Sequence, residues 1–450
     1  MPERMAAPTR PVRAVLRNRD FRLLWLAGLV SYIGSWSMFA ALPLYVFQAT
    51  GSALASGAVL TAMFVPLLFA SVAGVFVDRW DRRRTLLLGN LAMGVFGLPM
   101  LITSTGHGLW VAYVVMVMIG LISQFTAAAE NALLPRLVGK EHLLAANSLN
   151  SLNDNLARIV GPAVGGVVTA WVGLTGVVIM NTVCFLAAAG LITLMTATST
   201  AAVGSRDAVT TEPGLWAEWR AGLRMIFGIR LLAMVFLVCA VTMLADSVLT
   251  ALLAPFVVGE ISDAAWMLGL LLALRGVGGL LGGVLTGALS HRLRPATTLG
   301  FSLIIIGALL AVLVNVSVPV VAYVTITLIG VLAIPGLASQ QTLLQSNAEE
   351  SHLGRVFGAL GTTSALTMLV GSLLGGWLAE IVGVVPVLNV SAALYAAAGV
   401  LGLILLAGGS SISRRAGQGP RQGTGSGDAD PPQVPESVPA GRVEGDQARR

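Results

Sequence analysis

Charged residues are scarce in this chain. Of its 450 residues, 11% are Asp, Glu, Lys or Arg and 56% are hydrophobic, and the mean hydropathy is +0.85. Soluble globular domains carry about 25% charged residues, so this composition excludes a water-soluble fold, a disordered chain and a nucleic-acid-binding module. The two cysteines, Cys184 and Cys239, lie within apolar runs, which excludes a disulfide scaffold.

Sequence motifs of pumps, metalloenzymes and channels are also absent. The sole lysine, Lys140, is followed by Glu141, so no phosphate-binding loop ends in Gly-Lys-Ser or Gly-Lys-Thr. No filter loop is visible. No metal site is expected, because the four histidines are isolated from one another, at residues 107, 142, 291 and 352. We therefore expect no enzyme, no cofactor, no metal and no nucleic-acid partner.

Long apolar runs dominate what is present. A helix of about 20 apolar residues crosses the ~30 Å hydrocarbon layer of a bilayer. Twelve such runs follow one another, at 22–48, 52–77, 85–104, 109–130, 143–170, 173–197, 231–258, 264–290, 296–314, 319–345, 353–381 and 384–408. The sequence therefore predicts an all-α integral membrane protein with twelve transmembrane helices.

Basic residues alternate between the connections. Every second connection contains Arg or Lys, beginning with the N-terminal arm, whereas the connections near residues 50, 106, 172, 261, 316 and 382 contain neither. Short cytoplasmic loops retain Lys and Arg, so we expect a multi-pass protein of the cytoplasmic membrane with both termini in the cytoplasm. The first apolar run is too long for a cleavable signal peptide.

Two polar stretches divide the chain. Within the central connection, residues 216–224 form an amphipathic segment that we expect on the inner membrane face. The C-terminal tail is rich in Gly, Pro, Ser and Arg, and we expect it to be disordered. The predicted parts are an N-terminal cytoplasmic arm at 1–21, a six-helix half at 22–197, the central connection at 198–230, a second six-helix half at 231–408, and the tail at 409–450.

The two predicted halves repeat part of their sequence. An offset of 210 places the glycines at 161, 165 and 166 over those at 371, 375 and 376, and an offset of 213 places residues 74–79 over 287–292. Chance matching of apolar sequence is the alternative explanation. Because both offsets agree with the separation of the two blocks of helices, we expect two pseudo-symmetric halves.

Two motifs resemble signatures of the major facilitator superfamily. Residues 74–84, Gly-Val-Phe-Val-Asp-Arg-Trp-Asp-Arg-Arg-Arg, resemble its loop signature, and residues 157–166 resemble its antiporter signature. Residues 133–138, 146–149 and 155–162 are similar to the branch that exports macrolides and siderophores. The resemblance implies a monomeric secondary transporter that exports small amphipathic compounds by alternating access, in exchange for protons. An importer or uniporter on this fold, or a membrane sensor or scramblase, is the alternative.

The resemblance also assigns roles to the two motifs. The loop motif would join the halves at the cytoplasmic side, as a gate made of Gly74, Asp78, Arg79 and Arg83. The antiporter motif would form a kinked seal in the outer half of the cavity, made of Gly161, Pro162, Gly165 and Gly166. Small residues at 279, 283 and 287 would face this seal. Simple retention of the loop arginines in the cytoplasm and ordinary helix packing are the alternatives.

Charged side chains within the spans mark the candidate transport site. A charge at the membrane centre costs about 2.5 to 3.5 kcal/mol on insertion scales, so it normally faces water or a partner. Asp246 and Arg275 lie at similar depth in consecutive spans, and the fifth span carries Asn150, Asp154 and Arg158 on one polar face. Three aromatic residues are expected to line a cavity or to pack against lipid: Tyr32, Trp36 and Phe125.

Alternative roles stay open for these charges. We expect Asp246 to bind the proton, because its protonation would change with access to water and with the approach of Arg275. Arg275 is expected to hold an anionic part of the substrate, such as a catecholate or a carboxylate. A permanent Asp246–Arg275 ion pair is the alternative, and Asp154 with Arg158 can form a local i, i+4 pair.

Overall fold

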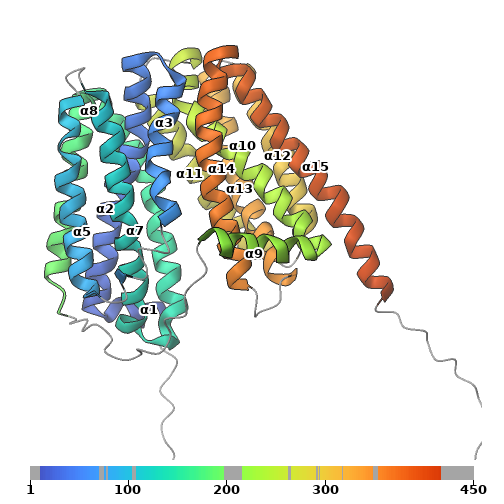
Figure 1. Cartoon of the computed structure of the whole chain (residues 1–450), viewed down its shortest axis with the longest axis horizontal. Coiled ribbons are helices and arrows are strands. Elements are labelled where there is room, and N and C mark those ends of the chain that lie inside the picture. The colour runs from blue at the N-terminus through green and yellow to red at the C-terminus, as the bar shows by residue number, and fades with distance from the viewer. Residues whose placement is uncertain are drawn as a thin grey trace, which may run out of the picture. The chain divides into compact units, whose positions relative to one another are not determined.

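The computed structural model describes residues 11–69, 76–77, 80–103, 108–196, 215–261, 265–289, 292, 294–316, 318–347 and 353–416. Within these ranges the chain forms helices and no β-strand, as Figure 1 shows. A helix satisfies its own backbone N–H and C=O groups, which an apolar environment requires. The prediction of an all-α fold is therefore confirmed. Parts of four predicted features lie outside the described residues: residues 1–10 of the N-terminal arm, Gly74, Asp78 and Arg79 of the loop motif, residues 198–214 of the central connection, and residues 417–450 of the tail.

Polar side chains start several helices of the N-terminal half. Asn18 accepts hydrogen bonds from the backbone N–H groups of Asp20 and Phe21, at 2.9 and 3.2 Å, and Ser52 and Asp81 cap two further helices. The elements of this half are α1 (Pro11–Arg17), α2 (Arg19–Thr50), α3 (Ala53–Phe64), η1 (Val65–Phe69), α5 (Arg82–Gly97), α6 (Met100–Thr103), α7 (Leu109–Val138), η2 (Lys140–His142) and α8 (Leu143–Thr193).

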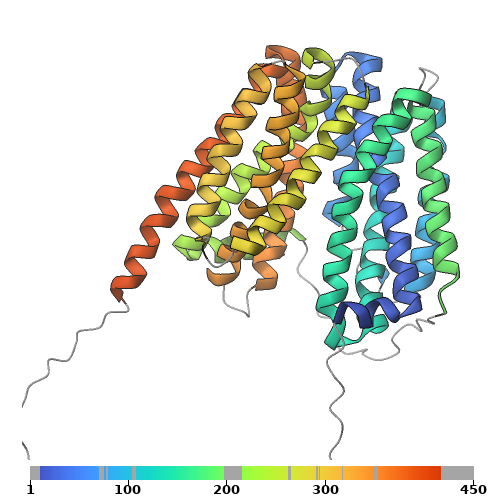
Figure 2. The same cartoon turned by 180° about the vertical axis from the view of Figure 1, so that it is seen from behind.

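α8 consists of two helical segments joined at Gly173. Gly173 has a φ of 72°, in the left-handed region that glycine adopts without strain. At one end of α8, the carbonyl of Leu149 accepts from the Trp25 indole at 2.9 Å; just beyond the other end, the backbone N–H of Thr196 donates to Asp20 at 3.0 Å. Both ends of α8 therefore lie beside the start of α2, and the chain reverses direction at Gly173 (Figure 2).

The C-terminal half begins after α9, the amphipathic helix of the central connection. Ile226 of α9 is fully buried in the apolar core, whereas Arg224 and Phe227 are exposed. The elements are α9 (Leu215–Gly228), α10 (Arg230–Phe256), η3 (Val257–Ile261), α11 (Ala265–Leu289), α12 (Pro295–Asn315), α13 (Pro319–Asn347), α14 (Leu353–Val382) and α15 (Val384–Ala416).

The helical part of the chain extends further than the sequence predicts. α15 continues to Ala416, so the residues at 409–416, which were expected to begin the disordered tail, are helical. This segment is rich in Ser and Arg, so its composition does not indicate that the apolar helix before it continues. The described residues up to Gly409 belong to one compact unit.

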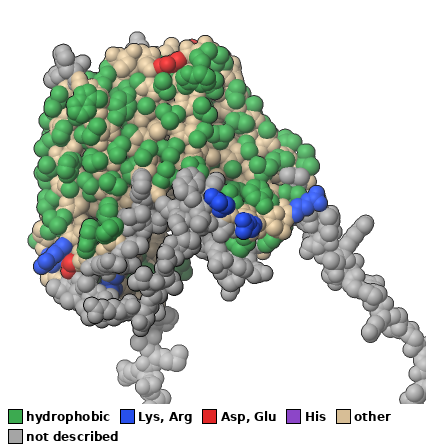
Figure 3. Space-filling model, in the orientation of Figure 1, with side chains coloured by type: hydrophobic (Ala, Val, Ile, Leu, Met, Phe, Trp, Pro, Cys, Tyr) green, Lys and Arg blue, Asp and Glu red, His purple; other side chains and the backbone are tan. Residues whose placement is uncertain are grey.

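Charged side chains gather at the two ends of the helices, and the surface between them is largely hydrophobic (Figure 3). We call one end the basic end, because the helix termini there carry Arg17, Arg84, Arg136 and Arg292. We call the other the acidic end, because it carries Glu260 and Glu380. Among the described residues, ten helices are long and apolar enough to cross a membrane. An apolar belt between two polar rims is the surface that a bilayer requires.

The ten helices are two fewer than the twelve predicted spans, because one helix contains two spans and another span is too short. α8 is one of the ten although its two segments run in opposite directions. The shorter apolar helix Ala53–Leu68 corresponds to the second predicted span, part of which lies outside the described residues. With α8 divided and this helix added, the described residues are compatible with the twelve predicted spans.

The repeated glycines occupy equivalent positions in the two halves. The first two glycines of the α8 triplet lie against Ser37 of α2, which donates its hydroxyl to the carbonyl of Gly161 at 2.7 Å. The first glycine of the α14 triplet lies against Ser247, 210 residues after Ser37, which donates to a backbone carbonyl of α14 at 2.9 Å. The third glycine of each triplet meets the other half: Gly166 meets α11, and Gly376 meets α3. This correspondence agrees with a duplicated unit.

The two halves meet toward the acidic end. The hydroxyl oxygens of Thr61 on α3 and Ser372 on α14 are 2.6 Å apart. Nearer to the acidic end, Glu380 accepts hydrogen bonds from the Ser52 hydroxyl and, at 3.4 Å, from the backbone N–H of Leu54. In both Figures 1 and 2 the helices of the two halves diverge toward the basic end. The interface between the halves is therefore a seam on the acidic side.

Candidate functional site

The polar face of α8 carries an ion pair. The Nε of Arg158 lies 3.0 Å from Oδ2 of Asp154, one helical turn earlier. The Arg158 guanidinium also lies over the Trp36 ring, 4.5 Å from its centroid, and the Trp36 indole donates to Asp154 at 3.4 Å. The local pair predicted for these residues is thus present. Exposed fractions of 55% for Arg158 and 43% for Asp154 leave both groups accessible to a ligand.

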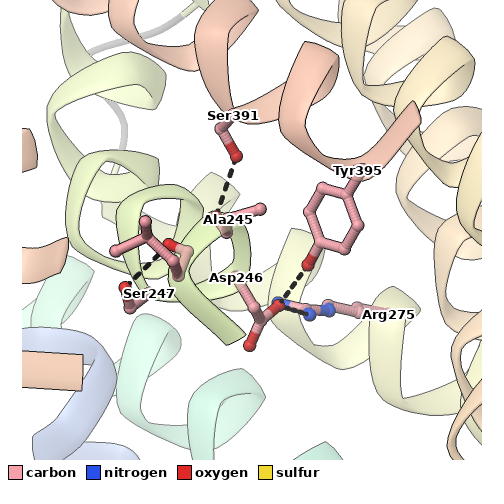
Figure 4. A network of polar contacts seen from close by, with 7 residues as sticks. Ala245, Asp246, Ser247, Arg275, Ser391 and Tyr395 are labelled. Carbon is pink, nitrogen blue, oxygen red and sulfur yellow. Dashed lines mark hydrogen bonds and ion pairs between the residues drawn. The ribbon is translucent and has the colours of Figure 1, made fainter. Parts of the chain in front are cut away.

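A second ion pair joins three helices of the C-terminal half (Figure 4). Arg275 of α11 donates to Oδ1 of Asp246 on α10 at 2.7 Å, and the Tyr395 hydroxyl of α15 donates to the same oxygen at 2.9 Å. Ser391 of α15 donates to the carbonyl of Ala245 at 2.8 Å and so fixes α15 beside α10. The expected partners Asp246 and Arg275 are brought together, and Tyr395 is a partner that sequence reasoning missed.

The two ion pairs lie next to each other where α8 meets α11. Gly276 of α11 lies directly against Ile159 of α8, and these residues follow Arg275 and Arg158 in the sequence. Arg158 is close enough to Asp246 to act on it electrostatically. At 1.5 Å per residue, Arg275 lies about 15 Å from the start of α11. The charges of both halves therefore meet well inside the apolar belt.

Glu130 of α7 forms a third polar cluster, and it was not among the predicted site residues. Its Oε2 accepts from the Tyr32 hydroxyl and its Oε1 from the Asn150 amide, both at 3.2 Å. Asn150 is therefore a partner of Glu130. The sequence places Glu130 at the end of an apolar run, but α7 continues to Val138, so Glu130 lies about 12 Å inside that end of the helix. Its partners are 98 and 20 residues away, and no local pattern indicates them.

Two adjoining cavities of about 190 Å³ each lie within the N-terminal half. One is lined by Tyr32, Asn90 and Glu130. The other is lined by four methionines, Met38, Met63, Met93 and Met116, together with aromatic side chains. The cavities share Ser35, Met93, Ser123, Gln124 and Phe185. Among the described residues no group of three or more His, Cys, Asp or Glu side chains is placed to hold a metal ion.

The three predicted cavity aromatics have different surroundings. Tyr32 lines a cavity and binds Glu130. Trp36 packs against Arg158. Phe125 stacks on Trp80, with ring centroids 5.8 Å apart, and belongs to an apolar cluster. The structure thus brings Tyr32 to a cavity and Trp36 to an ion pair, while Phe125 packs against another ring.

Arg83 of the predicted gate binds within its own half. Its Nε and Nη2 donate to the carbonyls of Ile192 and Thr193, at 3.2 and 2.8 Å, in the last turn of α8. A cation is favourable there because the last carbonyls of a helix lack partners within the helix. The other three residues predicted for the gate lie outside the described residues.

The predicted antiporter motif packs against the other half, but through different glycines from those expected. Pro162 and Gly166 of α8 lie directly against Gly269 of α11. The predicted facing seam at 279, 283 and 287 is wrong, because side chains added there would approach α13 or meet nothing. α11 contacts α8 through Gly269 and Gly276, which are seven residues, or about two turns, apart on one helix face. Glycines spaced four residues apart indicate a row of small residues on one helix face, but this spacing does not indicate which helix packs against that face.

Comparison with known families and proteins identifies relatives over most of the chain. A family model described as Major Facilitator Superfamily matches residues 24–371. The chain is 28% identical over 395 residues to "Enterobactin exporter EntS" of Escherichia coli O1:K1 / APEC, covering 86% of this chain and 91% of the relative. It is 29% identical over 395 residues to the protein of the same name from Citrobacter koseri, with the same coverage.

Solved structures share this fold at lower identity. A bacterial homologue of the iron transporter ferroportin superposes with a TM-score of 0.67 at 18% identity, covering 87% of this chain and 99% of that one. The nucleoside transporter NupG superposes with a TM-score of 0.71 at 10% identity, covering 86% of this chain and 99% of that one. The arrangement of helices is therefore that of known transporters.

Proposed function

Since this chain belongs to the major facilitator superfamily of transporters, we propose that it exports a small amphipathic compound across the cytoplasmic membrane in exchange for protons. The substrate class that we propose is siderophore-like, because relatives that match most of the chain are named enterobactin exporters. The six-helix halves at 22–197 and 231–408 rock about the substrate and expose it to each side in turn. The chain works as a monomer.

The position of the two ion pairs supports this function most directly. One pair belongs to each half, and the contact between Ile159 and Gly276 brings the two pairs together inside the apolar belt. Charges are costly there unless they serve a wet cavity or a partner. A solute that binds between the halves would touch charges from both, so its binding would bias their relative position.

The chemistry of this region suits an amphipathic substrate that carries acidic oxygens. Arg158 and Arg275 each present a planar guanidinium, which binds carboxylate-like oxygen pairs with two parallel hydrogen bonds. Both are held by an aspartate, with exposed fractions of 55% and 25%. The methionine-lined cavity of the N-terminal half, which Phe39 lines next to Trp36, offers adaptable contacts to aromatic rings. An anionic catecholate with aromatic rings would use both features.

In this transport cycle, the seam closes the cavity on one side of the membrane and the loop motif at the basic end closes it on the other. With the basic end in the cytoplasm, the contacts between Thr61 and Ser372 close the outer side. Gly161, Pro162, Gly165 and Gly166 contribute to this outer seal. In the opposite state the loop motif, with Gly74, Asp78, Arg79 and Arg83, closes the cytoplasmic side.

Everted membrane vesicles test the direction of transport and its coupling. Their interior corresponds to the outer side, so an exporter driven by protons accumulates substrate when the interior is made acidic. We expect uptake of enterobactin, a catecholate, under this gradient and loss of uptake when an ionophore collapses it. Vesicles without the protein give the background.

A pair of arginine variants controls for the site. Arg275→Gln removes a guanidinium from the region between the halves and is expected to reduce uptake strongly. Arg294→Gln removes an exposed arginine at the start of α12 and is expected to transport as the natural protein does. Uptake under the opposite gradient would identify an importer. Absence of uptake of siderophores, dyes and antibiotics under every gradient would contradict a transport function of this kind.

A further inference from the structure

Three carboxylates lie well inside the apolar belt among the described residues, and their partners differ. Asp154 pairs with Arg158, and Asp246 pairs with Arg275. Glu130 is in neither of these ion pairs. Its hydrogen-bond partners are the Tyr32 hydroxyl and the Asn150 amide, which are neutral.

An ionised carboxylate without a cation is costly in an apolar environment, and protonation removes that cost. The arginines beside Asp154 and Asp246 supply a positive charge that compensates each carboxylate. Glu130 has no such stabilisation, so its two protonation states are closer in free energy. Of the three groups, Glu130 is the one best suited to take up and release a proton during a transport cycle.

Water can reach Glu130 through the cavity that it lines. The cavity of about 190 Å³ has room for several water molecules, and Asn90 of α5 lines it as well. Asn90 is buried, with an exposed fraction of 6%, and its Oδ1 has no hydrogen-bond partner among the described residues. An unpartnered acceptor at a cavity wall is satisfied by water or by a hydroxyl group of a ligand.

Tyr32 links Glu130 to the ion pair of α8. Its hydroxyl donates to Glu130, and both Glu130 and Asp154 act on it electrostatically. The groups around Glu130 are thus Tyr32 of α2, Asn90 of α5, Gln124 of α7 and, on α8, Asn150 with the Asp154–Arg158 pair beyond it. These groups therefore extend from Glu130 to Arg158, which precedes the contact of Ile159 with Gly276 of α11 in the other half.

We propose that Glu130, rather than Asp246, is the proton-binding carboxylate, and that hydroxyl groups of the substrate compete with the proton for it. The proposal rests on the exporter function above and deepens it. Hydroxyl donors stabilise the ionised carboxylate, so a substrate that donates to Glu130 releases its proton. By reciprocity, the proton weakens substrate binding, which is the competition that exchange requires.

Infrared spectroscopy of the purified, full-length protein tests proton binding without transport. A protonated carboxyl group has its own C=O stretching band, which disappears on ionisation. Between mildly acidic and mildly alkaline pH we expect a titrating band in the natural protein and in Asp246→Asn, and its absence in Glu130→Gln. Glu130→Asp retains a carboxyl group and is expected to retain a titrating band, which controls for misfolding of the glutamine variant.

Substrate binding at the same pH values tests the competition. Affinity of the natural protein for enterobactin is expected to fall about 10-fold as the pH is lowered, within the usual range of coupling between two ligands. In Glu130→Gln the affinity no longer depends on pH, whereas in Asp246→Asn it still does. A titrating band that persists in Glu130→Gln, or that disappears in Asp246→Asn, would overturn the assignment. Failure of the natural protein to transport in vesicles would instead contradict the exporter function.

Discussion

At the scale of single residues, charges inside the apolar belt are arranged so that each has a specific neighbour. Asp246 is held by Arg275 and Tyr395, which come from two other helices. Removing one partner of a buried ion pair leaves an uncompensated charge and costs about 3 to 5 kcal/mol. Here Asp246 and Arg275 keep exposed fractions of 32% and 25%, so water screens the pair and reduces this cost.

A double-mutant cycle measures what this pair contributes. Asp246→Asn and Arg275→Gln are each expected to lower the free energy of unfolding by about 1 to 3 kcal/mol, and the double variant to recover at least half of the summed loss. Thermal unfolding in detergent gives the comparison. If the double variant regains stability and also transports normally, the pair only neutralises two charges. Strict additivity would show that the two side chains do not interact.

The depth of a charged residue along its predicted span indicates some of its interaction partners. Asp246 and Arg275 were expected at similar depth in consecutive spans, and an ion pair between them was one of the two interpretations that this depth allowed. Tyr395 and Glu130 could not be assigned in this way. Tyr395 is 149 residues from Asp246, and a tyrosine in an apolar helix has no pattern that separates a hydrogen-bonded site from ordinary packing.

At the scale of helices, glycine decides how closely two elements approach. Gly165 lies against the backbone of α2, where an added Cβ would be 2.9 Å from the Cα of Ser37. Gly190 lies on the second segment of the same helix, and no atom of the described neighbours lies within 4 Å of an added Cβ. The same substitution therefore meets opposite surroundings within one element.

Alanine at these two glycines gives a matched comparison. Gly165→Ala is expected to lower the free energy of unfolding by about 1 to 3 kcal/mol, because the two helices must separate. Gly190→Ala is expected to be neutral or stabilising by up to about 1 kcal/mol, since alanine favours a helix. Thermal unfolding of both variants checks this order. A proton leak into liposomes by Gly165→Ala, but not by Gly190→Ala, would support the seal; equal stability of the two variants would contradict the packing.

Hydrophobic patterning predicts most elements but not their neighbours. The long apolar runs, and the polar connection between the two blocks of runs, were sufficient to predict an all-α membrane fold. The glycine row at 279, 283 and 287 was assigned to the wrong neighbour, because the helix faces that meet are set by three-dimensional packing. Gly269 and Gly276 make the contact with α8, and their larger spacing hides them among the other glycines of α11.

At the scale of the whole helical body, the two halves touch along a seam on the acidic side. Thr61 and Ser372 contribute a direct hydrogen bond of 2.6 Å to that seam. Asn315 and Asn389 lie within the C-terminal half and share hydrogen bonds of 2.7 and 3.2 Å. A carrier that works by alternating access must break the first contact in each cycle, whereas the second can stay intact.

Disulfide cross-linking across the seam is the most direct test of this movement. With Cys184 and Cys239 replaced by alanine, Thr61→Cys/Ser372→Cys is expected to form a disulfide on oxidation, because the two side chains are in contact. Transport by the cross-linked protein should stop and should return on reduction. Asn315→Cys/Asn389→Cys should cross-link without loss of transport. Unchanged transport by the protein cross-linked at residues 61 and 372 would contradict the central claim that the halves separate there in each cycle.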